Sequence, residues 1–395
     1  MKKYMALALI LTLCLSGCNT SKPLPTEPST TAATLPSTAP TTVPAIPETT
    51  QPQLEIPHLP LTAVTTTTIT EIAPDGVQFE YSYPNIHLHL SDPSITDMVS
   101  LELLNRIDAT RTAAKEVMDS ADDQGAYFYT VRYDPARVDP GVLSLFGSHT
   151  SYGGGMHPNT ECVSVTYDLT TGDVLQLTDI LTLDCTAADL SPLVVDALAA
   201  LAEETYLYSD YPTVVEERFG QDLGEDSGWY LSNDGLCFYF SPYEVAPYAS
   251  GTVTAVIPYE KLVGLLRDAY FPLEKSGAVG DVDAVLFGQT DPDQFEQFAE
   301  VVIDKEGEAV LLHTEGLVYD VTIEYGEWNS EGTVFTPTST VFAAASLTPY
   351  DGVLLQAYFP DVMPILRLNY TTDEGTIQKY IFQSGKDGSI LLLDE

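Results

Sequence analysis

The sequence predicts an α+β protein, in which a largely antiparallel sheet packs on helices and a smaller all-β part follows. Two observations support this fold class. Between about residues 72 and 268, segments with alternating apolar and polar residues are interleaved with segments of helical periodicity. From about residue 279 to residue 395, short alternating segments recur between turns rich in Gly, Asn and Asp. That second pattern is typical of a β-sandwich or a small barrel.

The first 18 residues have the features of a lipoprotein signal peptide. Lys2 and Lys3 precede the apolar segment Met5–Leu15, which is too short for a stable membrane span. Leu15-Ser16-Gly17-Cys18 follows as a lipobox, so Cys18 is the expected lipidation site. Acyl chains there would anchor the protein to the outer face of the cell membrane. The alternative is an ordinary secretory signal with a chance cysteine.

Residues 19–70 are predicted to be a disordered tether. Thr, Pro, Ser and Ala dominate this segment, and such a composition cannot bury enough apolar surface to fold. If extended at about 3.1 Å per residue, roughly 50 residues would reach on the order of 150 Å. The segment could therefore carry a folded domain into the cell wall.

Periodicity then predicts the elements of residues 72–268 in order. The expected strands are an opening strand or strand pair in 77–90, broken at Pro84-Asn85, then Tyr127–Tyr133, Thr160–Leu169 with its hairpin return Val174–Leu177, Trp229–Leu231, Leu236–Phe240 and Thr252–Ile257. The expected helices are Ser94–Met118, capped by Asp92 or Ser94, and Leu190–Tyr206, Val214–Phe219 and Tyr259–Leu266.

The C-terminal part, residues 279–395, follows a short linker, Leu273–Val279. A short helix is expected at Pro292–Phe298. The expected strands are Ala309–Thr314, Leu317–Tyr325, Thr340–Ala345, Leu354–Phe359, Ile365–Tyr370, Gln378–Gln383 and Ile390–Leu393.

Two motifs carry more specific information. The first runs Ser148-His149-Thr150-Ser151-Tyr152-Gly153-Gly154-Gly155-Met156-His157-Pro158-Asn159, and its three glycines permit positive φ and close backbone approach. The second begins at Trp229, turns at Asn233-Asp234-Gly235 and ends in Ser241-Pro242-Tyr243-Glu244-Val245-Ala246-Pro247-Tyr248. As structural turns, both motifs would hold a sheet together.

Together and in this order, the motifs resemble the extracellular domain shared by RsiV-type anti-sigma factors and PdaC-type peptidoglycan deacetylases. The resemblance covers roughly residues 72–268 and implies recognition at the cell envelope, because the RsiV domain is a lysozyme receptor. The PdaC domain sits beside a catalytic domain that has no counterpart here. Only Met1–Tyr4 precede the apolar segment, so we expect no sigma-binding region. The residues expected to contact a ligand are Tyr152, Gly153, Gly154, Gly155, His157, Tyr243 and Tyr248.

Charge limits the classes of partner. The chain has 57 acidic and 16 basic side chains and a net charge of −41. A strong anion is a poor ligand for nucleic acid and anionic lipid headgroups, and it suits a cationic protein. The alternative interpretation is that the acidity only keeps a surface protein soluble.

The sequence predicts no catalytic activity, no metal and no cofactor. None of the common nucleophile, zinc or phosphate-binding motifs is present. His87 and His89 alternate along a strand, and two ligands alone make a weak metal site. His149 and His157 flank the glycine loop and could face each other, which leaves an unrecognised enzyme as a further hypothesis.

Three cysteines remain in the folded part after Cys14 and Cys18 are set aside. Cys162, Cys185 and Cys237 are expected to be free thiols, with a single bridge among them as the alternative. The favoured functional hypothesis is therefore a cell-surface lipoprotein that binds a cell-envelope or host component without catalysis. A lysozyme-like cationic protein is the preferred partner. The alternative is a peptidoglycan-binding accessory module for a separate cell-wall enzyme.

Overall fold

The computed structural model describes most of the chain from Leu61 onward. The described residues are 61–72, 78–90, 92–120, 126–202, 205–219, 223, 228–272, 282–286, 295, 297–330, 332–360, 363–372, 377–384 and 390–394. All of them belong to one compact unit, Ile56–Glu395. Cys18 and the predicted tether before Leu61 lie outside the described residues, as does His58.

The fold is α+β and mostly β, as the sequence predicts. A ten-stranded sheet has the order β17-β16-β15-β12-β13-β1-β2-β3-β4-β5, and two smaller sheets accompany it. None of the sheets is closed over the described residues. The elements of the first half are β1 (Leu61–Ile72), β2 (Gln78–His89), α1 (Pro93–Ser120), β3 (Ala126–Val138), β4 (Val142–Tyr152) and β5 (Asn159–Asp168).

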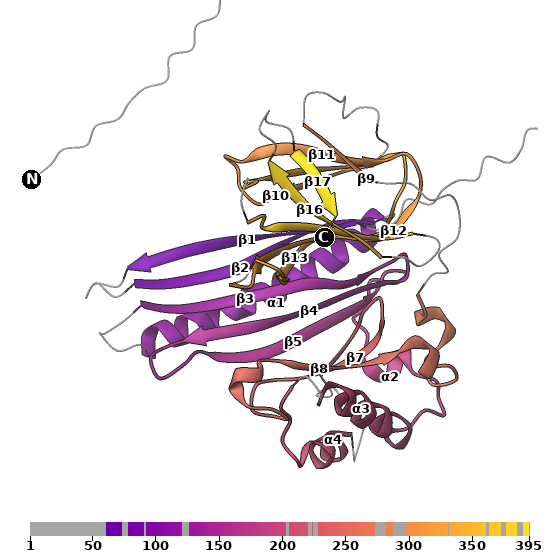
Figure 1. Cartoon of the computed structure of the whole chain (residues 1–395). Helices are drawn as coiled ribbons and strands as arrows, with labels where there is room; N and C mark the ends of the chain where they lie inside the picture. The colour runs from indigo at the N-terminus through magenta and orange to yellow at the C-terminus, as the bar shows by residue number, and fades with distance from the viewer. Residues whose placement is uncertain are drawn as a thin grey trace, which may run out of the picture. The chain divides into compact units, whose positions relative to one another are not determined.

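Helix α1 crosses over between β2 and β3, which are therefore parallel, and it lies along one face of the sheet (Figure 1). Val99 and Leu103 of α1 are buried against Tyr81, Tyr127 and Tyr129. The predicted helix Ser94–Met118 is confirmed. The side chain of Asp92 also caps it, because its Oδ1 accepts from the Ser94 N–H at 2.8 Å.

Not all of the apolar residues that predicted α1 are buried. Met98, Leu101 and Leu104 are exposed, with 50%, 60% and 59% of their surface accessible. The apolar pattern in this helix is therefore wider than the face that contacts the sheet. Periodicity located the helix correctly, and it overestimated the width of the buried stripe.

Two predictions in this half are wrong. The tether was expected to reach residue 70, but Leu61–Ile72 form β1, which pairs with β2 over all twelve residues. Threonine-rich sequence is also β-forming, and Ala63 and Val64 are buried. The expected break at Pro84-Asn85 is also absent, because β2 continues through Pro84 opposite Thr66.

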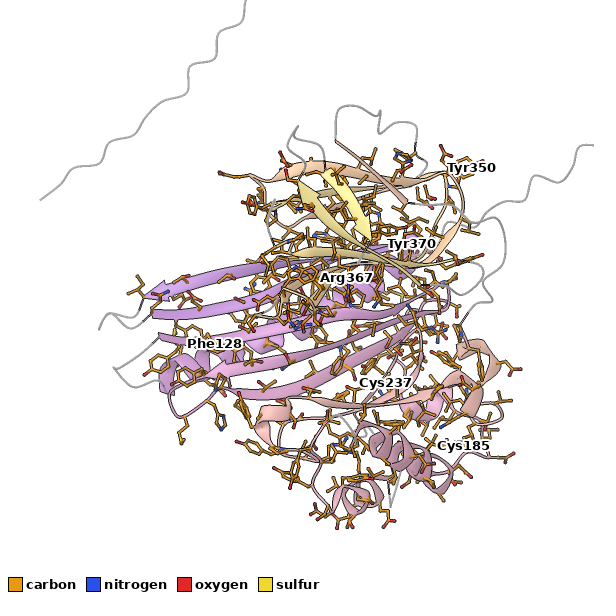
Figure 2. All side chains as sticks on the ribbon, viewed as in Figure 1. Phe128, Cys185, Cys237, Tyr350, Arg367 and Tyr370 are labelled. Atoms are coloured by element: carbon orange, nitrogen blue, oxygen red, sulfur yellow. The ribbon has the colours of Figure 1, made fainter. Side chains whose placement is uncertain are left out.

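A smaller three-stranded sheet and short helices follow. They comprise α2 (Leu177–Ile180), α3 (Ala187–Leu201), α4 (Tyr211–Phe219), β6 (Trp229–Leu231), β7 (Gly235–Phe240) and β8 (Val253–Pro258). The β6–β7 hairpin turns at the predicted Asn233-Asp234-Gly235. The predicted helix Tyr259–Leu266 is wrong, because only the 3-10 turn Tyr259–Lys261 forms there. Cys237 of β7 and Cys185 before α3 both lie in this part (Figure 2).

The C-terminal strands are β9 (Val282–Leu286), β10 (Gln297–Val302), β11 (Glu308–Thr314), β12 (Val318–Trp328), β13 (Phe335–Leu347), β14 (Asp351–Ala357), β15 (Leu366–Thr371), β16 (Ile377–Ser384) and β17 (Ile390–Asp394). The seven predicted strands are all present. β9 and β10 were missed, and Gln297-Phe298 begin β10 where a helix was expected. The rest of that predicted helix, apart from Phe295, lies outside the described residues.

One apolar core lies between the four-stranded sheet β10-β14-β11-β9 and the C-terminal strands of the large sheet. Ala63 of β1 belongs to that core, and β13 pairs with β1 at Leu61, Thr62 and Ala63. The expected C-terminal domain is therefore continuous with the sheet of the first half. Arg367 and Tyr370 lie on β15, which β12 separates from β13 in the same sheet (Figure 2).

A buried arginine joins the first sheet to the end of the three-stranded part. Arg137 of β3 is 2% exposed and pairs with Asp139. Its guanidinium also donates to the Tyr259 hydroxyl at 2.7 Å, to the Tyr270 carbonyl at 2.6 Å and to the Phe271 carbonyl at 3.1 Å. Since the charge is paired and its donors are used, burial is tolerated.

No helix in the described part of the chain is both long enough and apolar enough to span a membrane.

Candidate functional site

The glycine loop closes the hairpin formed by β4 and β5. Gly154 and Gly155 have φ of 101° and 127°, values that side chains rarely adopt. The hydroxyl of Tyr152 donates to the Gly155 carbonyl at 2.9 Å and so braces the turn. Ser148–Tyr152 of the first motif form the end of β4. β4 pairs with β5 across this loop. The predicted hairpin return Val174–Leu177 forms only in part, because Val174 bridges to Tyr167 of β5 but Leu177 begins α2.

Tyr152 itself is partly buried at the base of the loop. Its ring packs on those of Tyr127 and Phe128, with centroid distances of 6.1 Å and 6.0 Å. Figure 2 shows Phe128 at the same end of the sheet. Tyr152 therefore supports the loop, whereas Gly153, Gly154 and Gly155 are exposed.

The structure brings together three of the predicted ligand-contacting residues. His157 stacks on Tyr248, with ring centroids 4.2 Å apart and planes inclined by 26°. The hydroxyl of Tyr243 lies 3.1 Å from His157 Nε2, and the Tyr243 and Tyr248 rings are 5.7 Å apart. We call His157, Tyr243 and Tyr248 the aromatic tip. Its members come from the two separate motifs, and His157 and Tyr243 are 86 residues apart in the sequence.

Hydrogen bonding assigns the tautomer of His157. Nδ1 lies 2.9 Å from the carbonyl oxygen of Pro158, which can only accept, so Nδ1 carries the proton. In the neutral ring Nε2 is then the acceptor for the Tyr243 hydroxyl. Both ring nitrogens are therefore used within the tip. His157 therefore presents an oriented ring at the surface.

Tyr243 is held in an unusual backbone conformation. Its φ is 75°, although it is not glycine, and 54% of its surface is exposed. The turn is closed by the Tyr243 N–H donating to the Ala246 carbonyl at 3.0 Å. Glu244 accepts from the Ser241 N–H and pairs with Arg218 at 2.5 Å. A costly conformation on an exposed aromatic residue is a feature that recurs at functional sites.

Packing of the three-stranded sheet on β4 and β5 brings the second motif to the first. Phe146 stacks on Tyr230 with centroids 4.5 Å apart, and Ser164 Oγ donates to the Trp229 carbonyl at 2.5 Å. Nearer the tip, the Cys162 N–H donates to Ser241 Oγ at 3.3 Å. These contacts fix the chain direction just before Tyr243.

Met156 is a site residue that the sequence analysis missed. It lies between the glycines and His157, and its side chain is fully exposed. The sequence did contain a signal for Met156, namely a large apolar side chain within a glycine loop. A loop that only reverses the chain direction does not require an apolar side chain. Met156 adds a flexible apolar group beside the aromatic tip.

The other histidines in the described part of the chain do not assemble with His157. His149 lies on the helix-facing side of β4 between the rings of Tyr129 and Tyr133, each 6.2 Å away. Burial lowers the pKa of His149, and its Nε2 has no hydrogen-bond partner. The hypothesis that His149 and His157 face each other is therefore wrong. Burial, followed by the charge of His87, lowers the pKa of His89.

The cysteine thiols and the possible metal ligands are the remaining candidates for reactive groups. No group of three or more His, Cys, Asp or Glu side chains is suitably placed for a metal ion among the described residues. Cys162, Cys185 and Cys237 are free thiols, as expected, and Cys185 is only half-buried. Burial raises the pKa of Cys185 and of Cys237 to about 11, so neither thiol is a ready nucleophile at neutral pH.

Comparison with known proteins locates one family in this part of the chain. Residues 178–260 match the family described as a protein of unknown function, DUF3298. The DUF3298 segment includes α3, α4 and the three-stranded sheet, and it contains Tyr243 and Tyr248 but not the glycine loop. No curated protein matches the chain.

Solved structures of DUF3298 proteins are also similar to this chain. A DUF3298 family protein from Pseudomonas aeruginosa PAO1 is 17% identical with a TM-score of 0.40, and the match covers 53% of this chain and 96% of that one. A DUF3298 family member from Bacteroides fragilis NCTC 9343 is 19% identical with a TM-score of 0.40, and the match covers 53% and 94%.

Proposed function

We propose that this protein is a cell-surface lipoprotein that binds a lysozyme-like cationic protein and performs no catalysis. The observation that carries the proposal is the aromatic tip, where His157, Tyr243 and Tyr248 pack on one another beside the exposed Met156. Tyrosine and methionine are enriched at protein interfaces, and stacked rings lose little conformational entropy on binding. The likeness of the two motifs to the RsiV-type lysozyme receptor supports the same partner.

Charge supports a cationic partner. With a net charge of −41, the chain would attract a basic protein and raise its association rate. The tip would supply the short-range contacts that hold the complex. Long-range attraction and local stacking thus have separate roles in this proposal.

Location is the second part of the proposal. Lipidation of Cys18, followed by the Thr- and Pro-rich segment, would hold the binding domain outside the cell at a distance from the membrane. Replacing Cys18 with Ala should release the protein into the medium and abolish its labelling by fatty acid. Continued labelling of Cys18→Ala would contradict the anchor.

The alternative function is a peptidoglycan-binding accessory module for a separate cell-wall enzyme. One observation favours it, namely that exposed tyrosine rings such as Tyr243 are also suitable platforms for sugars. Acidic surface charge would contribute little to that mode of binding. The two functions therefore differ in their dependence on salt.

Substitution of the tip tests both functions. In the chain carrying Cys18→Ala, the double substitution Tyr243→Ala and Tyr248→Ala should weaken lysozyme binding by about tenfold or more, because central aromatic contacts dominate interfaces. Tyr350→Ala is a matched control, since Tyr350 is 48% exposed and lies between β13 and β14, in the C-terminal part of the chain (Figure 2). The melting temperature of each variant shows whether it is folded.

Three outcomes are distinguishable. Loss of lysozyme binding in the tip variant alone supports the proposal. The accessory module is favoured if the protein sediments with purified peptidoglycan and the tip variant does not. Added lysozyme should then have no effect on the sedimentation. Equal lysozyme binding by the tip variant and the Tyr350→Ala control would refute the assignment of the tip.

A further inference from the structure

A cavity of about 410 Å³ lies between the C-terminal half of α1 and the strands β1 and β2, away from the aromatic tip. Its volume is within the range of small-molecule sites. Phe79 and Tyr81 of β2 and Ala114 of α1 line it and are each less than 10% exposed, so the cavity has an apolar floor. Ile69 and Met118 form apolar walls on either side.

The polar groups of the floor are already satisfied. The Tyr81 hydroxyl lies 2.8 Å from Thr110 Oγ1 and donates to the Ile107 carbonyl at 3.3 Å. Tyr81 therefore presents the apolar surface of its ring to the cavity. An apolar group entering the cavity would leave no buried polar atom of Tyr81 without a partner.

Two cations lie at the rim of this apolar floor. Arg111 and Lys115 are one helical turn apart on α1, and both line the cavity. Like charges at this spacing repel each other, which destabilises the helix slightly. In a chain with 57 acidic and 16 basic side chains, this concentration of positive charge at one cavity is unusual.

Neither cation is fully neutralised by its neighbours. Arg111 pairs with Asp108 at 3.2 Å and lies over the Tyr83 ring at 5.5 Å, and its side chain remains 55% exposed. Lys115 makes no ion pair within the described part of the chain. Glu71 of β1 is the one carboxylate that lines the cavity among the described residues, and it makes no ion pair with them either. Among the residues that the structure describes, one positive charge at the rim thus has no counter-charge in contact.

We propose that this cavity binds a small molecule with an apolar body and a carboxylate. The body would occupy the space over Phe79, Tyr81 and Ala114, and the carboxylate would lie between Arg111 and Lys115. Fatty acids and apolar amino acids share this chemistry. Glu71 distinguishes them, because only an amino acid carries an ammonium group that this carboxylate would hold.

The test uses octanoate and phenylalanine as probes, and calorimetry on the full chain carrying Cys18→Ala. At least one of the two probes should bind. Arg111→Gln with Lys115→Gln should weaken that binding by about tenfold or more, because hydrogen bonds to charged groups are stronger than neutral ones. Lys261→Gln, at an exposed lysine outside the cavity, should have no effect. Octanamide and phenylalaninamide, which lack the carboxylate, should bind weakly or not at all.

The relative affinities of the two probes identify the class of the ligand. Tighter binding of octanoate assigns a fatty acid, whereas tighter binding of phenylalanine that is weakened by Glu71→Gln assigns an amino acid. The proposal is overturned if neither probe binds the folded protein, if the double variant binds equally well, or if the amides bind as tightly as the acids. Should the double variant melt early, Lys115→Gln alone provides the same comparison.

Discussion

Arg137 illustrates how a single buried residue joins distant parts of this chain. Its guanidinium contacts Asp139, Tyr259 and the carbonyls of Tyr270 and Phe271. Arg137→Met should reduce the free energy of unfolding by about 3–5 kcal/mol, because Asp139 would be left buried without its counter-ion. Arg111→Met, which removes an exposed pair, should cost less than about 1 kcal/mol. Urea denaturation measures both, and equal losses would contradict the role assigned to Arg137.

His149 predicts how stability depends on pH. Burial lowers its pKa below the ordinary value of 6.5, so the unfolded chain binds the proton more readily than the folded one. The stability that His149 contributes is present above about pH 6.5 and is lost as the pH falls through its folded-state pKa. The melting temperature should therefore fall between about pH 7 and pH 5, and His149→Gln should flatten that fall. An unchanged slope in the variant would show that other groups, such as His89, account for it.

Residue-level prediction from sequence succeeded where the signal was local. Successive glycines predicted a tight loop, and two of them have positive φ. The sequence could not show that Tyr243 and Tyr248 meet His157, because that contact depends on how two sheets pack. It also could not separate His149 from His157, since the face on which a strand residue lies depends on the register of β4.

At the scale of elements, β1 shows why composition alone was insufficient. Its run of threonines resembles the preceding segment, yet twelve residues pair with β2 and three pair with β13. Strand formation here depends on partners distant in sequence, which a local pattern cannot reveal. The α1 helix and the C-terminal strands, in contrast, have a strong periodicity of their own and were located correctly.

Deleting β1 tests its importance. A fragment that starts at residue 78 lacks β1 and leaves the edges of β2 and β13 unpaired, and it also loses Ala63 and Val64 from the buried core. We expect it to melt well below a fragment that starts at residue 56, or to aggregate through its exposed edges. Thermal unfolding followed by circular dichroism makes the comparison. The same melting temperature in both fragments would mean that β1 contributes little to the fold.

At the scale of the whole molecule, charge and architecture have different origins. The net charge of −41 follows from composition alone and bears on partners rather than on fold. The continuity of the two halves through β1 and β13 was not predictable, because three paired residues leave no pattern in the sequence. The proposed function combines the charge, which the sequence supplies, with the aromatic tip, which only the packed structure assembles.

The most direct test of that function is calorimetry with a basic lysozyme, on the chain carrying Cys18→Ala, at about 0.02 M and about 0.3 M salt. The Debye length falls several-fold over this range, so attraction between an acidic and a basic protein should weaken strongly. We predict tight binding at low salt, weaker binding at high salt and an association rate that falls by about tenfold or more. Absence of binding heat at low salt, with the protein shown to be folded, would contradict the proposed function.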